Sequence, residues 1–308
     1  MKAWVKQSPS ADTIELTDVP VPSIDDDELL VRVRAIGVGI HDSYFLPTDV
    51  SYPFPIGIEA AGVVELVGDA VSGYSRGDRI AFVSAMQPKG GTWAGYAAVK
   101  SSSLIVPIPS ALGFTEAAAL PVAGSTILRA MYPLAIPSGG SLFVAGASGA
   151  IGTLAIQLAH RKGWQVAASA SRKNHGYMLS LGAAKVVDYN DADWPEQIRQ
   201  WMPGGVDAAI AVQPGTSSGC VEVVRDGGQV VTVSGDQAAP KGRVRVEMIP
   251  YEVDVLGELK ALAADVADGR VRLALETHPF EEGLVALQNV QSRHARGKTV
   301  LTLEPQAG

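Results

Sequence analysis

A strand, a glycine-rich turn and a helix follow one another near the middle of this 308-residue chain. The strand-forming run 141–145 precedes Gly146, Gly149 and Gly152, which have the spacing Gly-x-x-Gly-x-x-Gly, and the apolar stretch 153–162 has helical character. A turn of this kind brings backbone N–H groups and a helix N-terminus against a pyrophosphate. Glycine also serves tight strand-to-helix turns for steric reasons alone, so the motif depends on its context.

The context of the turn is a βαβ unit. A second strand-forming run, 165–169, comes directly after Gly163, and the whole unit has the expected length. We therefore expect the turn to bind a dinucleotide. Its predicted contacts are Gly146, Ser148, Gly149, Ala150, Ile151 and Gly152.

The residues after the second strand indicate which dinucleotide binds. An NAD site usually places Asp or Glu there, where it accepts a hydrogen bond from the ribose 2′-OH. No acidic residue occurs between Gly163 and Val187, and the strand is followed by Ser171, Arg172 and Lys173. These side chains can bind a 2′-phosphate through charge-assisted hydrogen bonds. The pattern favours NADPH over NADH, with a solvated basic loop as the alternative.

Composition excludes several partners. The net charge of −7 argues against nucleic acid and anionic membranes, and no stretch approaches the length of a membrane span. Residues 1–5 read as a strand rather than as part of a signal peptide. The single cysteine, Cys220, excludes intrachain disulfides and cysteine-cluster metal sites. We expect a cytoplasmic, soluble enzyme.

The pattern of predicted secondary structure changes at about residue 115. Before it, short strand signals separated by turns predict a barrel or a curled sheet; they lie at 28–36, 61–68, 79–83 and 95–99. After it, apolar strands alternate with helical patterns, which predicts a parallel, doubly wound sheet. Two helical patterns and a closing strand follow, at 256–268, 281–293 and 297–303. The predicted parts are 1–114, 115–255 and 256–308.

Six segments in order along the chain carry a resemblance to a known family: 35–42, 55–64, 77–79, 146–152, 181–189 and 296–301. They resemble the medium-chain dehydrogenase/reductase superfamily, in its zinc-free quinone oxidoreductase (zeta-crystallin-like) branch. The resemblance implies an α/β fold in which a Rossmann domain with a doubly wound parallel sheet accompanies a partly open, GroES-like β-barrel catalytic domain. It implies that the C-terminal segment completes the barrel domain, and that the protein is a homodimer.

Two departures from the family pattern bear on metal binding. Zinc-dependent relatives carry a cysteine where this chain has Gly39 and a histidine where it has Ile58. Neither residue has a side-chain ligand, whereas a catalytic zinc needs three from the protein. We expect no metal. Without a Lewis acid, a quinone or a conjugated carbonyl is a more suitable hydride acceptor than a simple ketone.

The resemblance also suggests cofactor contacts beyond the glycine turn. Lys173 and Tyr189 match positions beside the adenosine 2′-phosphate, and Thr126 matches a threonine near the nicotinamide. Ser234 ends the last parallel strand, where strand ends open onto the crevice, and Lys298 follows an Arg-Gly-Lys pattern of the family. The structural alternatives are a packed aromatic for Tyr189 and a surface lysine for Lys298.

Three residues are candidates for catalysis. His41 stands where zinc-dependent relatives carry a proton-relay hydroxyl, and its ordinary pKa suits proton donation near neutrality. Asp42 can orient His41, although neighbours on a strand point to opposite faces. Tyr52 matches a tyrosine of many quinone and enoyl reductases and can hydrogen-bond a substrate carbonyl; Tyr44 is a weaker candidate. A structural role for His41 is the alternative.

These observations predict an NADPH-dependent reductase of quinones, with small-molecule substrates. One alternative is an ene or enoyl reductase of α,β-unsaturated carbonyls, which needs a placed proton donor such as Tyr52 or His41. The other is an NADPH-binding protein with a structural or sensing role and no turnover.

Overall fold

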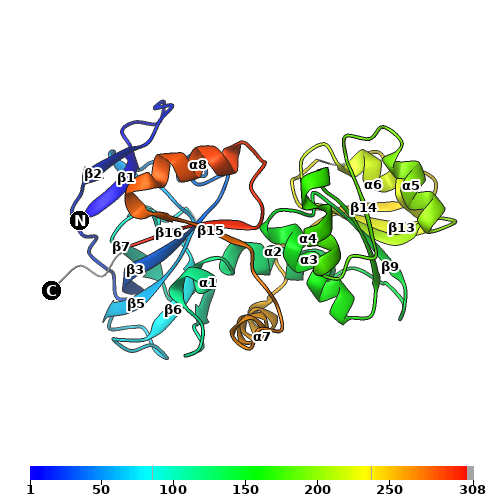
Figure 1. Cartoon of the computed structure of the whole chain (residues 1–308). Coiled ribbons are helices and arrows are strands. Elements are labelled where there is room, and N and C mark those ends of the chain that lie inside the picture. Colours follow the sequence, from blue (N-terminus) through cyan, green and yellow to red (C-terminus); the bar gives the residue numbers. More distant parts are fainter. Residues whose placement is uncertain (85, 237, 304–308) are drawn as a thin grey trace. The chain divides into compact units, whose positions relative to one another are not determined.

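The structure is a computed structural model that describes residues 1–84, 86–236 and 238–303. The described chain forms two compact units (Figure 1). The barrel unit contains residues 1–122, 256–270 and the C-terminal segment from Leu275. The nucleotide unit contains residues 123–255 and the short segment 271–274.

The barrel unit is built on a curled, mainly antiparallel sheet. Its strands are β1 (Lys2–Lys6), β2 (Glu15–Asp18), β3 (Glu28–Val38), β4 (Phe54–Pro55), β5 (Glu59–Val67), β6 (Arg79–Val83), β7 (Tyr96–Lys100), β8 (Ile105–Pro107), β15 (Leu275–Pro279) and β16 (Lys298–Thr302). The larger sheet has the order β15-β16-β3-β5-β6-β8, with β7 also paired to β3; β2, β1 and β4 form a smaller sheet. Only β15 and β16 pair in parallel among these described strands.

The long strand β3 organises this unit because it pairs with β5, β7 and β16. Val31 and Val33 are buried in the barrel core, whereas Arg32 and Arg34 lie on the other face. This alternation follows from the twofold period of a strand. The two arginines are therefore kept out of the core at no cost to the packing of the valines.

Helices and the C-terminal segment complete the barrel unit. The helical elements are α1 (Phe114–Ala118), α7 (Leu256–Ala267), η2 (Phe280–Glu282) and α8 (Gly283–Gln291). The Trp4 indole donates to the Phe280 carbonyl at 2.8 Å, and a Cβ at Gly283 would lie 2.4 Å from that indole nitrogen. The first strand and the C-terminal segment are thus packed together.

The nucleotide unit contains a six-stranded sheet in which all strands are parallel. Its elements are α2 (Pro121–Met131), which begins in the barrel unit, then β9 (Ser141–Ala145), α3 (Ala150–Arg161), β10 (Gln165–Ser169), η1 (Arg172–Asn174), α4 (His175–Ser180), β11 (Lys185–Val187), α5 (Trp194–Trp201), β12 (Val206–Ala211), α6 (Ser217–Val223), β13 (Val224–Thr232) and β14 (Arg245–Met248). The strand order is β11-β10-β9-β12-β13-β14. This is the Rossmann order, with the switch between β9 and β12. The predicted fold class is confirmed.

One strand of this sheet was not predicted. β14 has the sequence Arg-Val-Glu-Met and lies at an edge, where none of its residues is fully buried. An edge strand with polar side chains lacks the apolar run that marks a central parallel strand, so the sequence pattern gives little sign of it.

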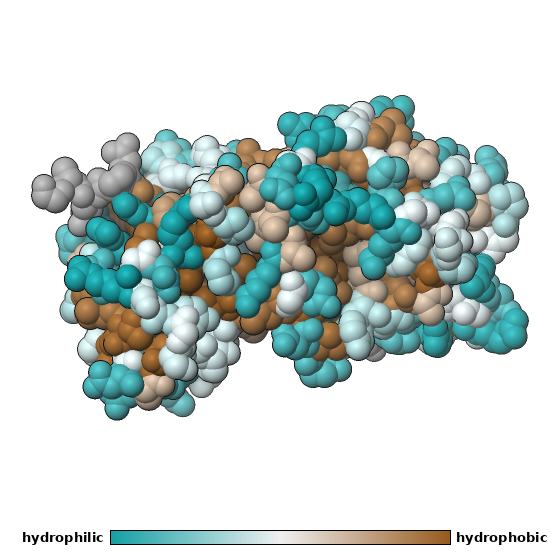
Figure 2. Space-filling model, turned by 90° about the horizontal axis from the view of Figure 1, so that it is seen from below, coloured by the Kyte–Doolittle hydropathy of each residue, from teal (hydrophilic) through white to brown (hydrophobic). Residues whose placement is uncertain are grey.

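The surface mixes residue types. On the face seen in Figure 2, hydrophilic side chains lie between apolar ones. The large exposed apolar side chains belong to separate elements and loops, for example Phe45, Leu66 and Met248. Isolated apolar residues of this kind need no binding partner. None of the helices in the described part of the chain is both long and apolar enough to cross a membrane.

Candidate functional site

The glycine turn after β9 has the geometry that its sequence requires. Gly146 has φ +76°, and a Cβ there would lie 2.5 Å from the Gln213 side chain. Gly152, in the first turn of α3, is so close to Ala147 that a Cβ would lie 2.5 Å from its Cα. Both positions therefore require glycine, the first for conformation and contact and the second for close packing of helix on turn.

The middle glycine faces open space. A Cβ at Gly149 would meet no atom within 4 Å, and Gly149 is the N-cap of α3. Ser148, Ala150 and Ile151 are half-buried around it. The first N–H groups of a helix have no partner within the helix, so an open glycine turn at this helix N-terminus fits a pyrophosphate, since the amides and the helix dipole both favour negative charge.

The predicted phosphate-binding residues follow β10. Ser171 accepts a hydrogen bond from the Asn174 amide at 3.2 Å, while Arg172 and Lys173 are exposed. The Arg172 guanidinium extends into solvent and lies 3.3 Å from the Asp191 carboxylate. Two cationic side chains therefore stand where a 2′-phosphate is expected.

Two carboxylates lie beside this basic cluster, and sequence reasoning did not count them. Asp188 comes directly after β11, the strand beside β10, and accepts hydrogen bonds from Asn190 and from the Arg172 backbone N–H at 3.1 Å. The bonds from Asn190 hold the pKa of Asp188 below its usual range, and Arg172 adds to this. The carboxylate is thus ionised and orders the loop. Asp191 instead competes with a phosphate for the Arg172 guanidinium.

The other predicted cofactor contacts lie at separate places in the nucleotide unit. Tyr189 is about half exposed after β11, and Thr126 is half-buried on α2. Ser234 follows the carboxyl end of β13 and donates its hydroxyl to Asp236. Asp236 also accepts from the backbone N–H groups of Gly215 and Ser217.

Sequence reasoning therefore missed Asp236, which ties the end of β13 to the start of α6, and Gln213, which covers Gly146. Their signal was the position of each residue just after a parallel strand, where ligands of such sheets bind.

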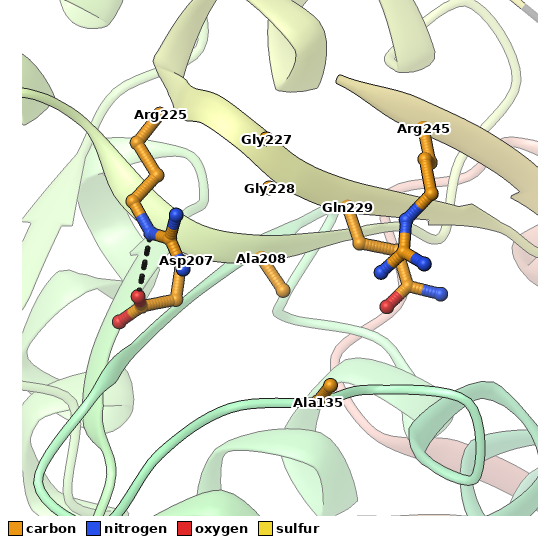
Figure 3. A pocket seen from close by; sticks show the side chains of 8 residues that line it. All are labelled: Ala135, Asp207, Ala208, Arg225, Gly227, Gly228, Gln229 and Arg245. Carbon is orange, nitrogen blue, oxygen red and sulfur yellow. Dashed lines mark hydrogen bonds and ion pairs between the residues drawn. The ribbon is translucent and has the colours of Figure 1, made fainter. Parts of the chain in front are cut away.

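A recess in this unit lies at the opposite ends of the strands (Figure 3). It is lined by Asp207 and Ala208 at the start of β12 and by Arg245 at the start of β14, and its volume is about 20 Å³. Arg225 donates to Asp207 across it at 2.8 Å. It has room for about one water molecule and lies away from the carboxyl ends of the strands, so it does not suit a dinucleotide.

A buried ion pair lies in the barrel unit. Lys298, on β16, is 8% exposed and contacts the carboxylate of Glu59, on β5, which is 1% exposed. The other carboxylate oxygen of Glu59 accepts from the Val122 backbone N–H at 2.7 Å. Lys298, predicted as a cofactor contact, thus has its ammonium group engaged by Glu59 and is not the surface lysine of the alternative interpretation.

Asp42 is a second buried carboxylate of this unit. It is 1% exposed and accepts from the Gly39 backbone N–H and from the Trp93 indole, each at 2.9 Å. Burial raises the pKa of Asp42 to about 7, against the opposing effect of Lys298. Among the hydrogen bonds of the described residues none joins Asp42 to His41, so the carboxylate holds the loop at Gly39 rather than the imidazole.

The two other predicted catalytic residues lie on the loop between β3 and β4. His41 is exposed, and its ring meets Tyr44 edge to face with centroids 5.4 Å apart. Partial burial lowers the pKa of His41, and the positive charge of Arg293 adds to this. Tyr52 is half-buried with its ring 6.3 Å from Phe54. Among the ring contacts of the described residues none joins His41 to Tyr52, so the two belong to separate aromatic pairs on this loop.

The residues at the family's zinc position do not fit a zinc ion. Gly39 and Ile58 offer no side-chain ligand, and Glu59 is bound to Lys298. Among the described residues, one group of carboxylates has ligand atoms within 4.8 Å of one another, and its members are Asp25, Asp27 and Glu28. Lys89 and Lys100 pair with that group, which lies at the other end of β3 from Gly39.

A Rossmann unit with a glycine turn, joined to a GroES-like barrel unit, defines a class of two-domain oxidoreductases. The family described as "Zinc-binding dehydrogenase" matches residues 181–301, and "Alcohol dehydrogenase GroES-like domain" matches residues 25–110. The chain belongs to the medium-chain dehydrogenase/reductase superfamily.

Known relatives are similar over nearly the whole chain. A 2-methylene-furan-3-one reductase of Solanum lycopersicum is 32% identical over 98% of this chain and 79% of its own length. An NADPH-dependent alkenal/one oxidoreductase, chloroplastic, of Arabidopsis thaliana is 31% identical with the same coverage. A quinone oxidoreductase of Rattus norvegicus is 30% identical over 93% of this chain and 92% of its own length. The fold matches that of Escherichia coli quinone oxidoreductase, solved with NADPH, with a TM-score of 0.83 at 20% identity over 98% of this chain and 99% of that one.

Proposed function

We propose that this protein is a zinc-independent, NADPH-dependent reductase whose electrophile is a quinone. The observation that carries the proposal is the combination of a glycine turn fit for a pyrophosphate with a zinc position that lacks ligands. A quinone needs little activation because the charge that arrives with the hydride is delocalised over its ring. The similarity to the quinone oxidoreductase of Rattus norvegicus supports this choice.

NADPH would be held by residues of the nucleotide unit. The turn Gly146–Gly152 would bind the pyrophosphate, and Arg172 with Lys173 would bind the 2′-phosphate. Thr126, Tyr189 and Ser234 remain proposed contacts. The chemistry that NADPH supplies when bound is hydride donation to an electrophilic carbon, and the protein contributes binding, orientation and proton control.

The barrel unit would bind the substrate with groups on the loop after β3. Asp42 fixes the backbone at Gly39, two residues before His41, and burial together with Arg293 lowers the pKa of His41. The Tyr52 hydroxyl can donate a hydrogen bond to a carbonyl oxygen. Lys298 is held by Glu59, and we assign it a positioning role rather than a direct contact.

The second candidate function is an ene reductase of α,β-unsaturated carbonyls. It is favoured by the relatives named as reductases of a furanone and of alkenals, which match 98% of this chain. This reaction requires a proton at the α-carbon after the hydride arrives at the β-carbon, so it needs a placed donor. Tyr52 and His41 are the proposed donors.

NADPH oxidation measured against a panel of quinones, enones and enoyl thioesters tests both functions, with NADH as the control cofactor. We expect quinone turnover with a clear preference for NADPH. If NADPH binds measurably but no compound of the panel causes its oxidation, the structural or sensing role is supported instead.

The variants Tyr52→Phe and His41→Ala separate the two reactions. A quinone reductase should keep most of its turnover in both variants, whereas an ene reductase should lose enone turnover in the variant that lacks its donor. If enone turnover survives in both, neither residue is the acid.

Two coarser properties complete the proposal. We propose a homodimer, which fits the family and leaves the edge strand β14 as a pairing surface, and a cytoplasmic location, which fits the net charge of −7. Light scattering coupled to gel filtration tests the first, and fractionation of cells tests the second.

A further inference from the structure

Two arginines lie on the outer face of β3; Arg32 has an ion pair with Glu65, whereas Arg34 has none among the described residues. Arg32 and Arg34 alternate with the core residues Val31 and Val33, and both side chains are partly buried. The backbone beside them is held by hydrogen bonds, since the Val33 N–H donates to the Gly95 carbonyl and the Arg34 carbonyl accepts from Leu303. The arginines thus extend from a part of the barrel unit whose backbone is tied to neighbouring segments.

Each of these arginines has an enclosed nitrogen without a partner. The Nε atoms of Arg32 and Arg34 are shielded from solvent and have no hydrogen-bond acceptor among the described residues. The Arg32 Nε lies 3.6 Å from Glu65, beyond hydrogen-bond distance, and Glu65 makes its close contact of 2.7 Å with Arg76. A buried donor without an acceptor destabilises the fold, so such donors in native proteins call for an explanation.

The two arginines line a cavity of about 410 Å³. Lys2 adds a third cation to its wall and Glu281 a single anion. Lys2 also lies 3.9 Å from Asp18 and Arg32 lies 3.6 Å from Glu65, so Arg34 is the lining cation without an ion pair among the described residues. Tyr96 and Phe280 contribute aromatic surface. This volume falls within the range of small-molecule sites, which combine apolar walls with a few polar groups.

A solvated basic face does not account for these observations. Surface lysines and arginines normally keep their charged groups in water, and Lys2 does so with a side chain that is 60% exposed. Arg34 instead encloses its Nε within the cavity wall. The Arg34 guanidinium, whose Nε is enclosed and has no acceptor, lies on the same strand face as Arg32, and such a group can bind a planar or tetrahedral oxyanion with two parallel hydrogen bonds.

We propose that this cavity of the barrel unit binds a small organic anion through a carboxylate or phosphate group, with Arg32, Arg34 and Lys2 on the oxyanion and Tyr96 and Phe280 against the apolar body. The site lies within the barrel unit, at residues other than those of the glycine turn and of the loop after β3. It does not depend on the proposed reductase function, because it uses none of the residues assigned to that function.

Isothermal titration calorimetry on the full chain in phosphate-free buffer tests the proposal. The probes are phenyl phosphate, benzoate and inorganic phosphate, with benzyl alcohol as the neutral analogue. We expect saturable binding of the aromatic anions, weaker binding of inorganic phosphate and none of benzyl alcohol. The ratio between phenyl phosphate and benzoate identifies the preferred oxyanion.

Variants locate the binding. Arg34→Gln should weaken binding by about tenfold or more, because charge-assisted bidentate bonds are lost. Lys2→Gln, whose side chain is exposed and dispensable for folding, should weaken it by a smaller factor, and Lys260→Gln, an exposed lysine of α7, should leave it unchanged. Absence of saturable binding to the wild-type protein would overturn the proposal. Equal binding by wild type, Arg34→Gln and Lys2→Gln would also overturn it and would direct attention to Arg172 and Lys173.

Discussion

The buried carboxylate of Asp42 makes the stability of the protein depend on pH in a direction opposite to that of most carboxylates. Its pKa is raised from the ordinary 3.8 to about 7, chiefly by burial, and the negative charge of Glu59 adds to the effect. The charged form is therefore less stable in the folded protein than in the unfolded chain. Asp42 contributes stability that is complete at low pH and is lost as the pH rises from about 4 through about 7.

The size of this effect follows from the two pKa values. A difference of one in pKa corresponds to about 1.4 kcal/mol, so a rise from 3.8 to about 7 corresponds to about 4 kcal/mol lost above pH 7, as an upper bound. The variant Asp42→Asn cannot ionise and should lack this loss. Gly39 and Trp93 donate to the same carboxylate oxygen, Oδ2, so the amide oxygen of asparagine can accept both bonds, and a small difference that does not vary with pH should replace the loss.

The assay is urea unfolding at a series of pH values between 5 and 8, with the difference in unfolding free energy between wild type and Asp42→Asn as the readout. Taking the difference removes the contributions of His41 and His278, which titrate in both proteins. Asp49→Asn, at an exposed aspartate, is the control and should follow the wild type. If the difference between wild type and Asp42→Asn stays constant from pH 5 to pH 8, Asp42 is ionised throughout and the reasoning from burial is refuted.

Three further predictions concern other residues. Asp191→Asn should lower the KM for NADPH about two- to fivefold and leave that for NADH unchanged, since it removes an exposed competitor for Arg172; an equal change for both cofactors would contradict this. Gly152→Val should lower the melting temperature through about 1–3 kcal/mol of overpacking against the preceding turn, measured by calorimetry. Lys298→Met should cost about 3–5 kcal/mol in unfolding free energy, because it leaves the buried carboxylate of Glu59 without its cation; unchanged stability in urea unfolding would contradict this.

The sequence predicted those elements of the fold that depend on neighbouring residues in the chain. The apolar runs at β9, β12 and β13 and the glycine spacing of 146–152 follow from backbone geometry within a few residues, and the parallel sheet was predicted from them. The edge strand β14 was missed because its residues are mostly polar and none of them is fully buried, so it lacks an apolar run. The family resemblance supplied the order of the parts, which local pattern does not contain.

The parts that could not be predicted depend on residues far apart along the chain. Lys298 contacts Glu59 across 239 positions, and Trp93 donates to Asp42 across 51. No local periodicity connects residues so far apart. The sequence alone therefore favoured a cofactor contact for Lys298 and an orienting role toward His41 for Asp42. The acidic residue Asp188 was overlooked for the same reason, since it joins the basic cluster through the pairing of β10 with β11 and not through sequence proximity.

The buried charges of the barrel unit can be understood together with the lack of zinc ligands. Among the described residues the unit contains three buried carboxylates; Glu28 pairs with Lys89, whereas Lys298 is the cation that acts on both Asp42 and Glu59. Lys298 contacts Glu59 directly, whereas it lowers the pKa of Asp42 only through space. One lysine cannot fully compensate two buried negative charges, and the carboxylate without a direct contact is the one that approaches neutrality near pH 7. Loss of Lys298 should therefore raise the pKa of Asp42 further, so that in Lys298→Met the loss of stability still begins near pH 4 but continues to a higher pH and becomes larger.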